Sequence, residues 1–312
     1  MAEQVWERAD VPLKFQLGDI IFGSAALSLF RRSARLDEKP LDVGDTPEPP
    51  PRLDGADGYV IWSQPIARNL PVLSARRDSV LYTPRQYRRF SADLSGNFEQ
   101  YMSAFSGKTR SSLRRKLRKF IEASGGIIDC KEYRKPEEIS EFFPLARKLS
   151  AKTYQDRLLR CGLPTDEAFI KTAMALSQED RLRAYLLFLK GEPISYLYCP
   201  VNQGTVVYDH LGYDPAHASL SPGTVLQILA LQALFAERRH LMFDFTEGEG
   251  QHKEVFATAS LLCADVFIIK RKLLPLSVVM LHRTIDQASR GAGAVLDRLR
   301  LKSRVRQLVR RI

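Results

Sequence analysis

Residues 208–256 read YDHLGYDPAHASLSPGTVLQILALQALFAERRHLMFDFTEGEGQHKEVF, and this stretch decides the fold. It predicts a strand, a turn at Ser221-Pro222-Gly223, a long helix, a second strand and a polar loop. Pro222 and Gly223 favour a tight turn that most residues would resist. The first turn of a helix presents backbone N–H groups without partners and the positive end of the helix dipole. Strand, turn and helix together therefore predict a site for an anion such as phosphate.

The elements around this stretch indicate an α/β (α+β) domain with a mixed, mostly antiparallel sheet flanked by helices. The helix over 224–238 is apolar on most sides and must therefore be packed on most sides. Two strands upstream are joined by Lys190-Gly191-Glu192-Pro193, which favours a hairpin. The remaining expected elements are helices over 98–105, 111–124, 136–154 and 166–178, and strands over 127–130, 182–189, 194–200, 205–211, 241–245 and 264–270.

A basic segment lies about a hundred residues before the turn. Residues 108–119 hold seven Lys or Arg and no acidic residue. Unbalanced like charges on a helix repel each other, which favours an anionic ligand over a merely solvated face, although the solvated face remains the alternative. Arg110 and Arg114 are the candidate substrate-binding residues. A nucleotide-linked sugar, a phosphorylated lipid carrier and tRNA all fit this charge.

These motifs together resemble the GNAT acyltransferase superfamily. In order along the chain they are Ser106-Gly107-Lys108-Thr109-Arg110, Asp214, Ser221-Pro222-Gly223, Phe243-Asp244-Phe245, and Lys253 with Phe256. The pattern is most similar to the branch associated with bacterial cellulose and exopolysaccharide biosynthesis, which is related to the Fem-type aminoacyl transferases. The resemblance covers roughly residues 105–269. One departure is the Ser-Pro-Gly turn, which stands where the common GNAT phosphate loop reads Q/R-x-x-G-x-G/A.

The resemblance implies an acyltransferase without a permanently bound cofactor. An amine or hydroxyl of a sugar or envelope precursor would attack the thioester of acyl-CoA, with acetyl-CoA as the expected co-substrate. Such an enzyme holds the pyrophosphate, polarises the thioester carbonyl and removes a proton from the nucleophile. Ser221, Gly223, Thr224 and Val225 would hold the pyrophosphate.

Four residues are candidates for the catalytic steps. His210 lies on the strand expected beside the thioester, and histidine needs little tuning to act as a base. Asp244 follows a strand between two phenylalanines, where burial would strengthen it as a base. Glu247 lies in a glycine-rich loop. Lys253 matches a lysine of the family and would offer a cation to developing negative charge. Each also has a plainer interpretation as a packed, structural or solvated residue.

Composition limits the remaining choices. A chain of 312 residues with 45% apolar and 27% charged residues suits one large or two smaller globular domains. The four cysteines are scattered without a C-x-x-C pair, so the sequence predicts neither a metal site nor a disulfide framework. Together with the lack of an apolar leader, this favours the cytoplasm, with the inner membrane face as a peripheral location.

The charge and composition divide the chain into three expected parts. Residues 1–104 form an N-terminal region, which the Fem-type resemblance suggests is a degenerate GNAT-like half, and they include a proline-rich acidic loop at 37–58. Residues 105–270 form the acyltransferase domain. Residues 271–312 form a basic helical tail with eleven Lys or Arg and two acidic residues. Such a tail suits an anionic membrane surface, or a docked helix with a wet basic face.

Two alternative functions stay open from the sequence. A Fem-type enzyme would take its aminoacyl group from tRNA, which the basic segment at 108–119 favours. A catalytically silent GNAT-fold adaptor would bind polyanions or a membrane through its basic surfaces. Dependence on aminoacyl-tRNA separates the first from a CoA-dependent enzyme, and salt-sensitive polyanion binding without CoA-ester binding supports the second.

Overall fold

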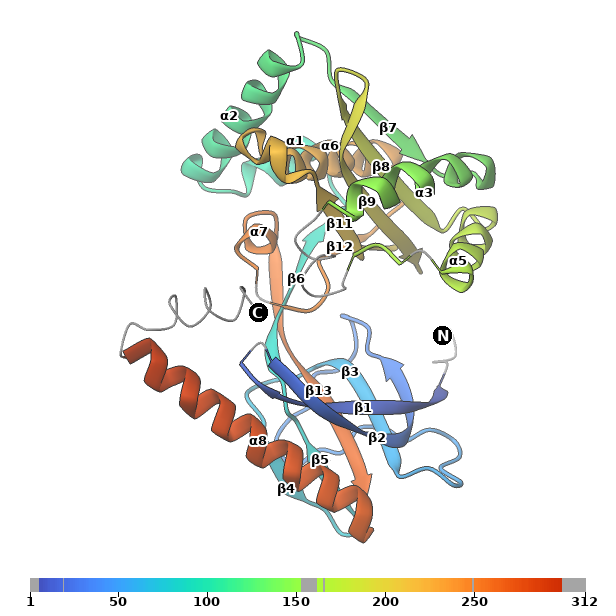
Figure 1. The fold of residues 1–312 in the computed structure, drawn as a ribbon, viewed down its shortest axis with the longest axis vertical. Helices are drawn as coiled ribbons and strands as arrows, with labels where there is room; N and C mark the ends of the chain where they lie inside the picture. Colours follow the sequence, from blue (N-terminus) through green and yellow to red (C-terminus); the bar gives the residue numbers. More distant parts are fainter. Residues whose placement is uncertain (1–5, 19, 153–161, 165, 249, 299–312) are drawn as a thin grey trace. The chain divides into compact units, whose positions relative to one another are not determined.

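The computed structural model describes residues 6–18, 20–152, 162–164, 166–248 and 250–298 (Figure 1). It divides the chain into two compact units, residues 1–87 with 261–312, and residues 88–260. These divisions differ from the sequence boundaries near 104 and 270. Residues 88–104 group with the second unit because β6 (Gln86–Asp93) pairs there with β12 (Met242–Asp244). Residues 261–270 group with the first unit because β13 (Ala259–Lys270) pairs there with β3 (Gly58–Pro65).

The sheet of the second unit runs in the order β6-β12-β10-β9-β8-β7. All neighbouring pairs are antiparallel except β10 with β12, so the sheet is mixed and mostly antiparallel, as predicted. A further strand, β11, pairs with β9. The bounds not yet given are β7 Asp129–Tyr133, β8 Leu182–Leu189, β9 Glu192–Asn202, β10 Thr205–Val207 and β11 His210–Tyr213.

Helices cover both faces of this sheet. Along β8, Tyr185 and Leu187 belong to one buried cluster while Ala184 and Leu186 belong to the other, because successive strand residues point to opposite faces. The first cluster packs under α1 (Phe98–Ser103), α2 (Gly107–Ala123) and α6 (Pro222–Glu237). The second packs under α3 (Pro136–Ser150) and α5 (Glu167–Gln178). The result is a sheet between two helical layers, with short helices η1 (Pro215–Leu220) and α7 (Gln251–Glu254) in its loops.

Most predicted elements of this unit are confirmed, and two differ. The strand predicted over 205–211 is two short strands, β10 and β11, because the chain keeps β9 as a neighbour but loses its pairing with β12 between them. The helix predicted over 136–154 ends at Ser150, and residues 153 and 154 of that prediction lie outside the described residues. The described part of the long helix starts at Pro222, where proline suits the first helical position.

The first unit is built on a second group of strands in the order β1-β2-β3-β13, with β5 paired to β13 and β4 to β5. Gly58 at the start of β3 has φ +155°, and a Cβ there would lie 2.0 Å from the carbonyl oxygen of Ile268, so only glycine permits this pairing. Strands β1 and β2 pair antiparallel along most of their length, and neither was predicted from the sequence. The remaining bounds are β1 Glu7–Leu17, β2 Ile20–Ser33, β4 Leu73–Ala75 and β5 Ser79–Tyr82.

The described part of the basic tail is a helix, α8 (Leu273–Arg298), that packs on the first unit (Figure 1). Val279 is fully buried in the cluster formed by the first-unit strands, and the Tyr82 hydroxyl lies 2.6 Å from Nδ1 of His282. Residues 273–290 therefore follow the second expectation for the tail, a helix docked on the protein. Residues 299–312 of the predicted basic tail lie outside the described residues. No helix in the described part of the chain combines the length and the apolar character needed to cross a membrane.

Candidate functional site

The sheet of the second unit opens where β10 gives way to β11. The backbone N–H of Tyr208 donates to the carbonyl of Asp244 at 2.8 Å, whereas the next N–H, from Asp209, donates to Tyr198 at 3.3 Å. Consecutive residues thus bond to neighbouring strands on opposite sides. Beyond this point β11 pairs with β9 and no longer follows β12. The two strands therefore diverge beyond Val207, and His210 lies at the start of the diverging strand.

The Ser221-Pro222-Gly223 turn opens α6 without a side-chain cap. Ser221 adopts the left-handed conformation (φ 53°, ψ 48°), and its carbonyl accepts from the N–H of Val225 at 3.1 Å. The N–H of Val225 is therefore used inside the helix. The N–H groups of Gly223 and Thr224 have no partner among the described residues and face the start of the helix. Of the four residues predicted here, the turn thus offers two backbone donors.

Two lysines of α2 flank this turn. The Lys116 ammonium lies 3.4 Å from Oγ1 of Thr224, and the Lys119 ammonium donates to the carbonyl of Ser219 at 3.0 Å. The basic segment and the turn at the start of α6, a hundred residues apart in the sequence, therefore form one positively charged region. Sequence reasoning missed Lys116. Its place beside the apolar face of the helix, between Leu113 and Leu117, was the signal that it faces a packed neighbour.

His210 sits at the start of β11 in contact with a carboxylate. Its Nε2 lies 3.6 Å from Oδ2 of Asp209, and its ring packs against Phe169 and Tyr198. Burial lowers the pKa of the imidazole, and Asp209 raises it in part, which leaves it below the ordinary value. Burial likewise raises the pKa of Asp209, against the opposing effect of His210. A half-buried, neutral histidine beside the strand divergence has the properties of a general base.

The Asp244 carboxylate forms an ion pair with an arginine. It is 1% exposed, and Arg89 pairs with both carboxylate oxygens, with Nε at 3.0 Å from Oδ1. The N–H of Thr246 also donates to Oδ1 at 2.9 Å. Both carboxylate oxygens are thus engaged by the protein itself, so this arrangement favours the structural interpretation of Asp244. Arg89 lies 155 residues away in the sequence, and no local pattern pointed to it.

The Lys253 side chain contacts the backbone of Glu247. The Lys253 ammonium donates to the carbonyl of Glu247 at 2.6 Å and lies 3.4 Å from Oγ1 of Thr246. It also sits over the Tyr208 ring, 5.9 Å from the centroid. Burial lowers the pKa of this ammonium, and Asp244 and Glu247 partly offset that effect. Lys253 thus ties α7 to Thr246 and Glu247 beside the strand divergence, while the Glu247 side chain is exposed.

The two predicted substrate arginines differ in their surroundings. Arg110 donates through Nη1 to the carbonyls of Ser103 and Phe105, at 3.0 and 2.8 Å, and so closes the end of α1. Arg114 is exposed and makes no hydrogen bond or ion pair to another described residue. Arg114 is therefore the better placed of the two to meet a ligand.

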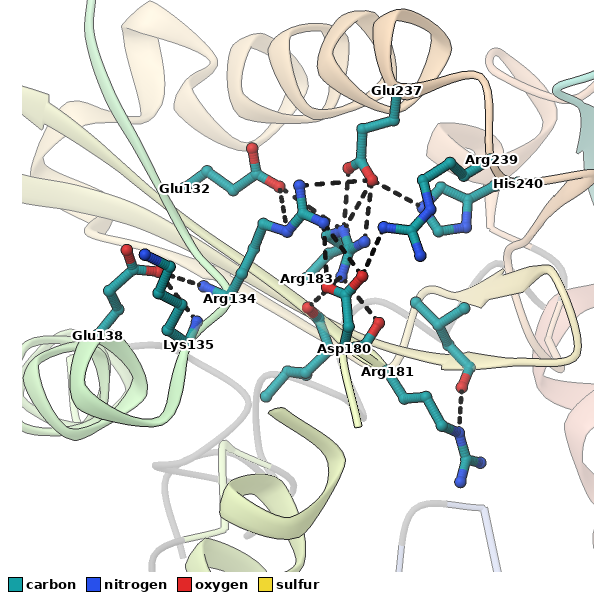
Figure 2. A network of polar contacts seen from close by, with 12 residues as sticks. Glu132, Arg134, Lys135, Glu138, Asp180, Arg181, Arg183, Glu237, Arg239 and His240 are labelled. Atoms are coloured by element: carbon teal, nitrogen blue, oxygen red, sulfur yellow. Dashed lines mark hydrogen bonds and ion pairs between the residues drawn. The ribbon is translucent and has the colours of Figure 1, made fainter. Parts of the chain in front are cut away.

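A second charged cluster lies elsewhere in the same unit (Figure 2). Arg183 on β8 is fully buried and bonds to Glu237 through Nε and Nη2 at 2.9 Å each, and to Asp180 at 3.0 Å. Burial raises the pKa of Glu237, but hydrogen bonds from His240 and Arg183 overcome it and hold the pKa at about 2. Arg134 and Arg239 pair with Asp180. These charges satisfy one another, so the cluster is structural.

Residues 107–254 match the family model described as "Acetyltransferase (GNAT) domain". The match runs from the start of α2 to the end of α7. The matched segment carries the basic helix α2, the strand divergence and the α6 turn, and the family that it matches is one of acetyltransferases. The match spans a little under half of the chain. Among the described residues no group of His, Cys, Asp and Glu could hold a metal ion.

Solved structures with a similar arrangement are only distantly related in sequence. FemX is 10% identical over 90% of each chain, with a TM-score of 0.47. The C-terminal domain of a protein described as a lysylphosphatidylglycerol synthetase from Agrobacterium fabrum is 9% identical, covering 73% of this chain and 72% of that one, with a TM-score of 0.47. L-PGS from Bacillus licheniformis is 14% identical over 73% of each chain, with a TM-score of 0.43. Among curated proteins no relative matched the sequence.

Proposed function

We propose that residues 107–254 form a GNAT domain that transfers an acyl group, with acetyl as the expected group, from acyl-CoA to an amine or hydroxyl of a sugar or envelope-polysaccharide precursor. The observation that carries the proposal is the uncapped start of α6, where the N–H groups of Gly223 and Thr224 meet the Lys116 ammonium. Backbone donors, helix dipole and a cation converge there, and this combination suits a pyrophosphate.

The divergence of β11 from β12 would receive the thioester end of the same donor. Backbone N–H groups at the edge of β11 would polarise the thioester carbonyl, and His210 would accept the proton of the attacking amine or hydroxyl. Nucleophilic attack forms the new C–N or C–O bond, the C–S bond breaks, and CoA leaves as a thiol. The lowered pKa of His210 keeps it in the neutral form that this step requires at pH 7.

An assay of thiol release from acetyl-CoA tests this function. Glucosamine and glucose serve as the first amine and hydroxyl acceptors, and His210→Gln is compared with His217→Gln, a matched change in the neighbouring 3-10 helix η1. The proposal expects acceptor-dependent thiol release that His210→Gln reduces by about 100-fold, in the range typical of a general base, while His217→Gln retains it. Equal loss in both variants, or none in His210→Gln, would contradict the role of His210.

The exposed arginines of α2 favour one second candidate, an aminoacyl-tRNA donor. In that case thiol release from acetyl-CoA fails with every acceptor, and activity requires charged tRNA. A chain that binds neither donor would instead be the silent adaptor.

A further inference from the structure

A groove on the second unit is not used by the proposed donor site. It has a volume of about 630 Å³ and lies where α1, α2 and α6 meet. Its apolar side chains are contributed by all three helices: Phe98, Met102, Leu113, Leu117 and Ile228. We call it the apolar groove. Its volume falls in the range of small-molecule binding sites, which are concave and mostly apolar with a few polar groups.

One end of the apolar groove is strongly cationic. Arg110 and Arg114 line it, and the same two residues line an adjoining depression of about 430 Å³ with Arg115 and Arg118. We call these four residues the arginine row. Arg114, Arg115 and Arg118 make no hydrogen bond or ion pair to other described residues, and all three are exposed. One carboxylate, that of Glu99, also lines the groove, so the local balance is four positive charges against one negative charge.

An apolar groove that leads into an arginine row matches a molecule with the same two parts. We infer that the site binds a phosphorylated amphiphile, with its alkyl chain in the apolar groove and its phosphate on the arginine row. Arginine forms bidentate contacts with phosphate oxygens, and the groove removes the chain from water. A free phosphate would leave the groove empty. A nucleic acid would need stacking surfaces for its bases, and among the described residues that line the groove Phe98 is the one aromatic ring.

The inference goes beyond the proposed function and does not require acyl-CoA. The donor turn involves Gly223, Thr224 and Lys116, none of which lines the groove or the depression. If the proposed function holds as well, the amphiphile is the lipid-linked form of the acceptor. If acetyl-CoA binding fails, the amphiphile site stands by itself.

Calorimetric titration of the full chain with dodecyl phosphate below its micelle concentration tests the inference. The expected result is binding at one site, unchanged by saturating CoA, that weakens when octyl phosphate replaces dodecyl phosphate. Each methylene that leaves the groove should weaken binding roughly fourfold. Inorganic phosphate supplies the head alone and dodecyl maltoside the chain alone, and both should bind much more weakly.

Variants assign the two parts of the site. Arg114→Ala with Arg118→Ala should weaken dodecyl phosphate by at least about tenfold, because charge-assisted contacts to phosphate are lost. Lys108→Ala removes a charge from the same helix outside both cavities and should change binding less than about twofold. Gln232→Trp places a ring in the groove from an exposed position of α6 and should weaken binding, whereas Ala236→Trp, one turn further along, should not.

Several outcomes would overturn the inference. Equal binding of inorganic and dodecyl phosphate would leave an anion site without a chain site. Equal binding of dodecyl maltoside would leave an unspecific apolar surface. Displacement by CoA would place the probe at the α6 turn. Binding to phosphatidylglycerol vesicles or to a single-stranded RNA, without binding of the monomeric amphiphile, would reassign the arginine row to a membrane or to nucleic acid.

Discussion

Two charged clusters in the second unit use the same residue types in opposite ways. Around Arg183, each arginine lies within 4.0 Å of a carboxylate, and the central guanidinium is fully buried. Around the α6 turn, the cations of α2 outnumber nearby acids, and two backbone N–H groups have no partner among the described residues. The first cluster satisfies its charges internally. The second leaves two backbone N–H groups without partners among the described residues, and this difference separates a structural cluster from a candidate binding site.

The largest expected effect comes from breaking the satisfied cluster. Arg183→Met should reduce the free energy of unfolding by about 3–5 kcal/mol, because it leaves Glu237 and Asp180 without their buried partner. Urea unfolding followed by circular dichroism measures this loss. Arg181→Ala, which removes a largely exposed pair with Glu179 and one hydrogen bond to the carbonyl of Val201, should cost about 1 kcal/mol. Equal losses in the two variants would remove the distinction between the clusters.

A substitution at Asp244 tests whether this residue, predicted to be catalytic, instead forms a structural ion pair. Asp244→Asn should lower the free energy of unfolding by about 2 kcal/mol, since it weakens hydrogen bonds to the Arg89 guanidinium. Glu254→Gln, on an exposed position of α7, should stay within about 0.5 kcal/mol. A variant of unchanged stability that has lost acyl transfer would instead return Asp244 to the role of general base.

The dependence of the free energy of unfolding on pH, at acid pH, tests the same difference between the two clusters. Glu237 and Asp180 each have a pKa of about 2, below the usual values of 4.5 and 3.8. As the pH falls, the unfolded chain takes up protons at these groups before the folded chain does, so stability is complete above about pH 5 and declines toward pH 2. Glu237→Gln should flatten this decline in urea unfolding measured across pH. A decline of unchanged steepness would show that Glu237 does not contribute to it.

Most helices and strands of the second unit could be predicted from the sequence because their signals are local. The hairpin of β8 and β9, helix α5 and the Ser-Pro-Gly turn at the start of α6 all follow from neighbouring residues. The break at Tyr208 and Asp209 was missed, because it arises from two different neighbouring strands and not from the composition of residues 205–211.

The site was predicted in part for the same reason. The turn could be found because it is contiguous, but the partner of Asp244 and the approach of Lys116 to Thr224 depend on packing across more than a hundred residues. Arg110 had the expected charge, yet its hydrogen bonds to the end of α1 are visible only in the folded chain. Residue type predicted what could bind an anion, and only the contacts showed which residues already had partners.

The most direct test of the unsatisfied cluster is calorimetric titration with acetyl-CoA. Thr224→Glu is the most informative variant, because an acid in the first turn favours the helix while it repels a pyrophosphate. Wild-type protein and Lys108→Ala should bind alike, whereas Thr224→Glu should show no measurable binding and Lys116→Ala should bind about tenfold more weakly. Binding that is equal in all four proteins, or absent from the folded wild type, would contradict the claim that the α6 turn is the donor site.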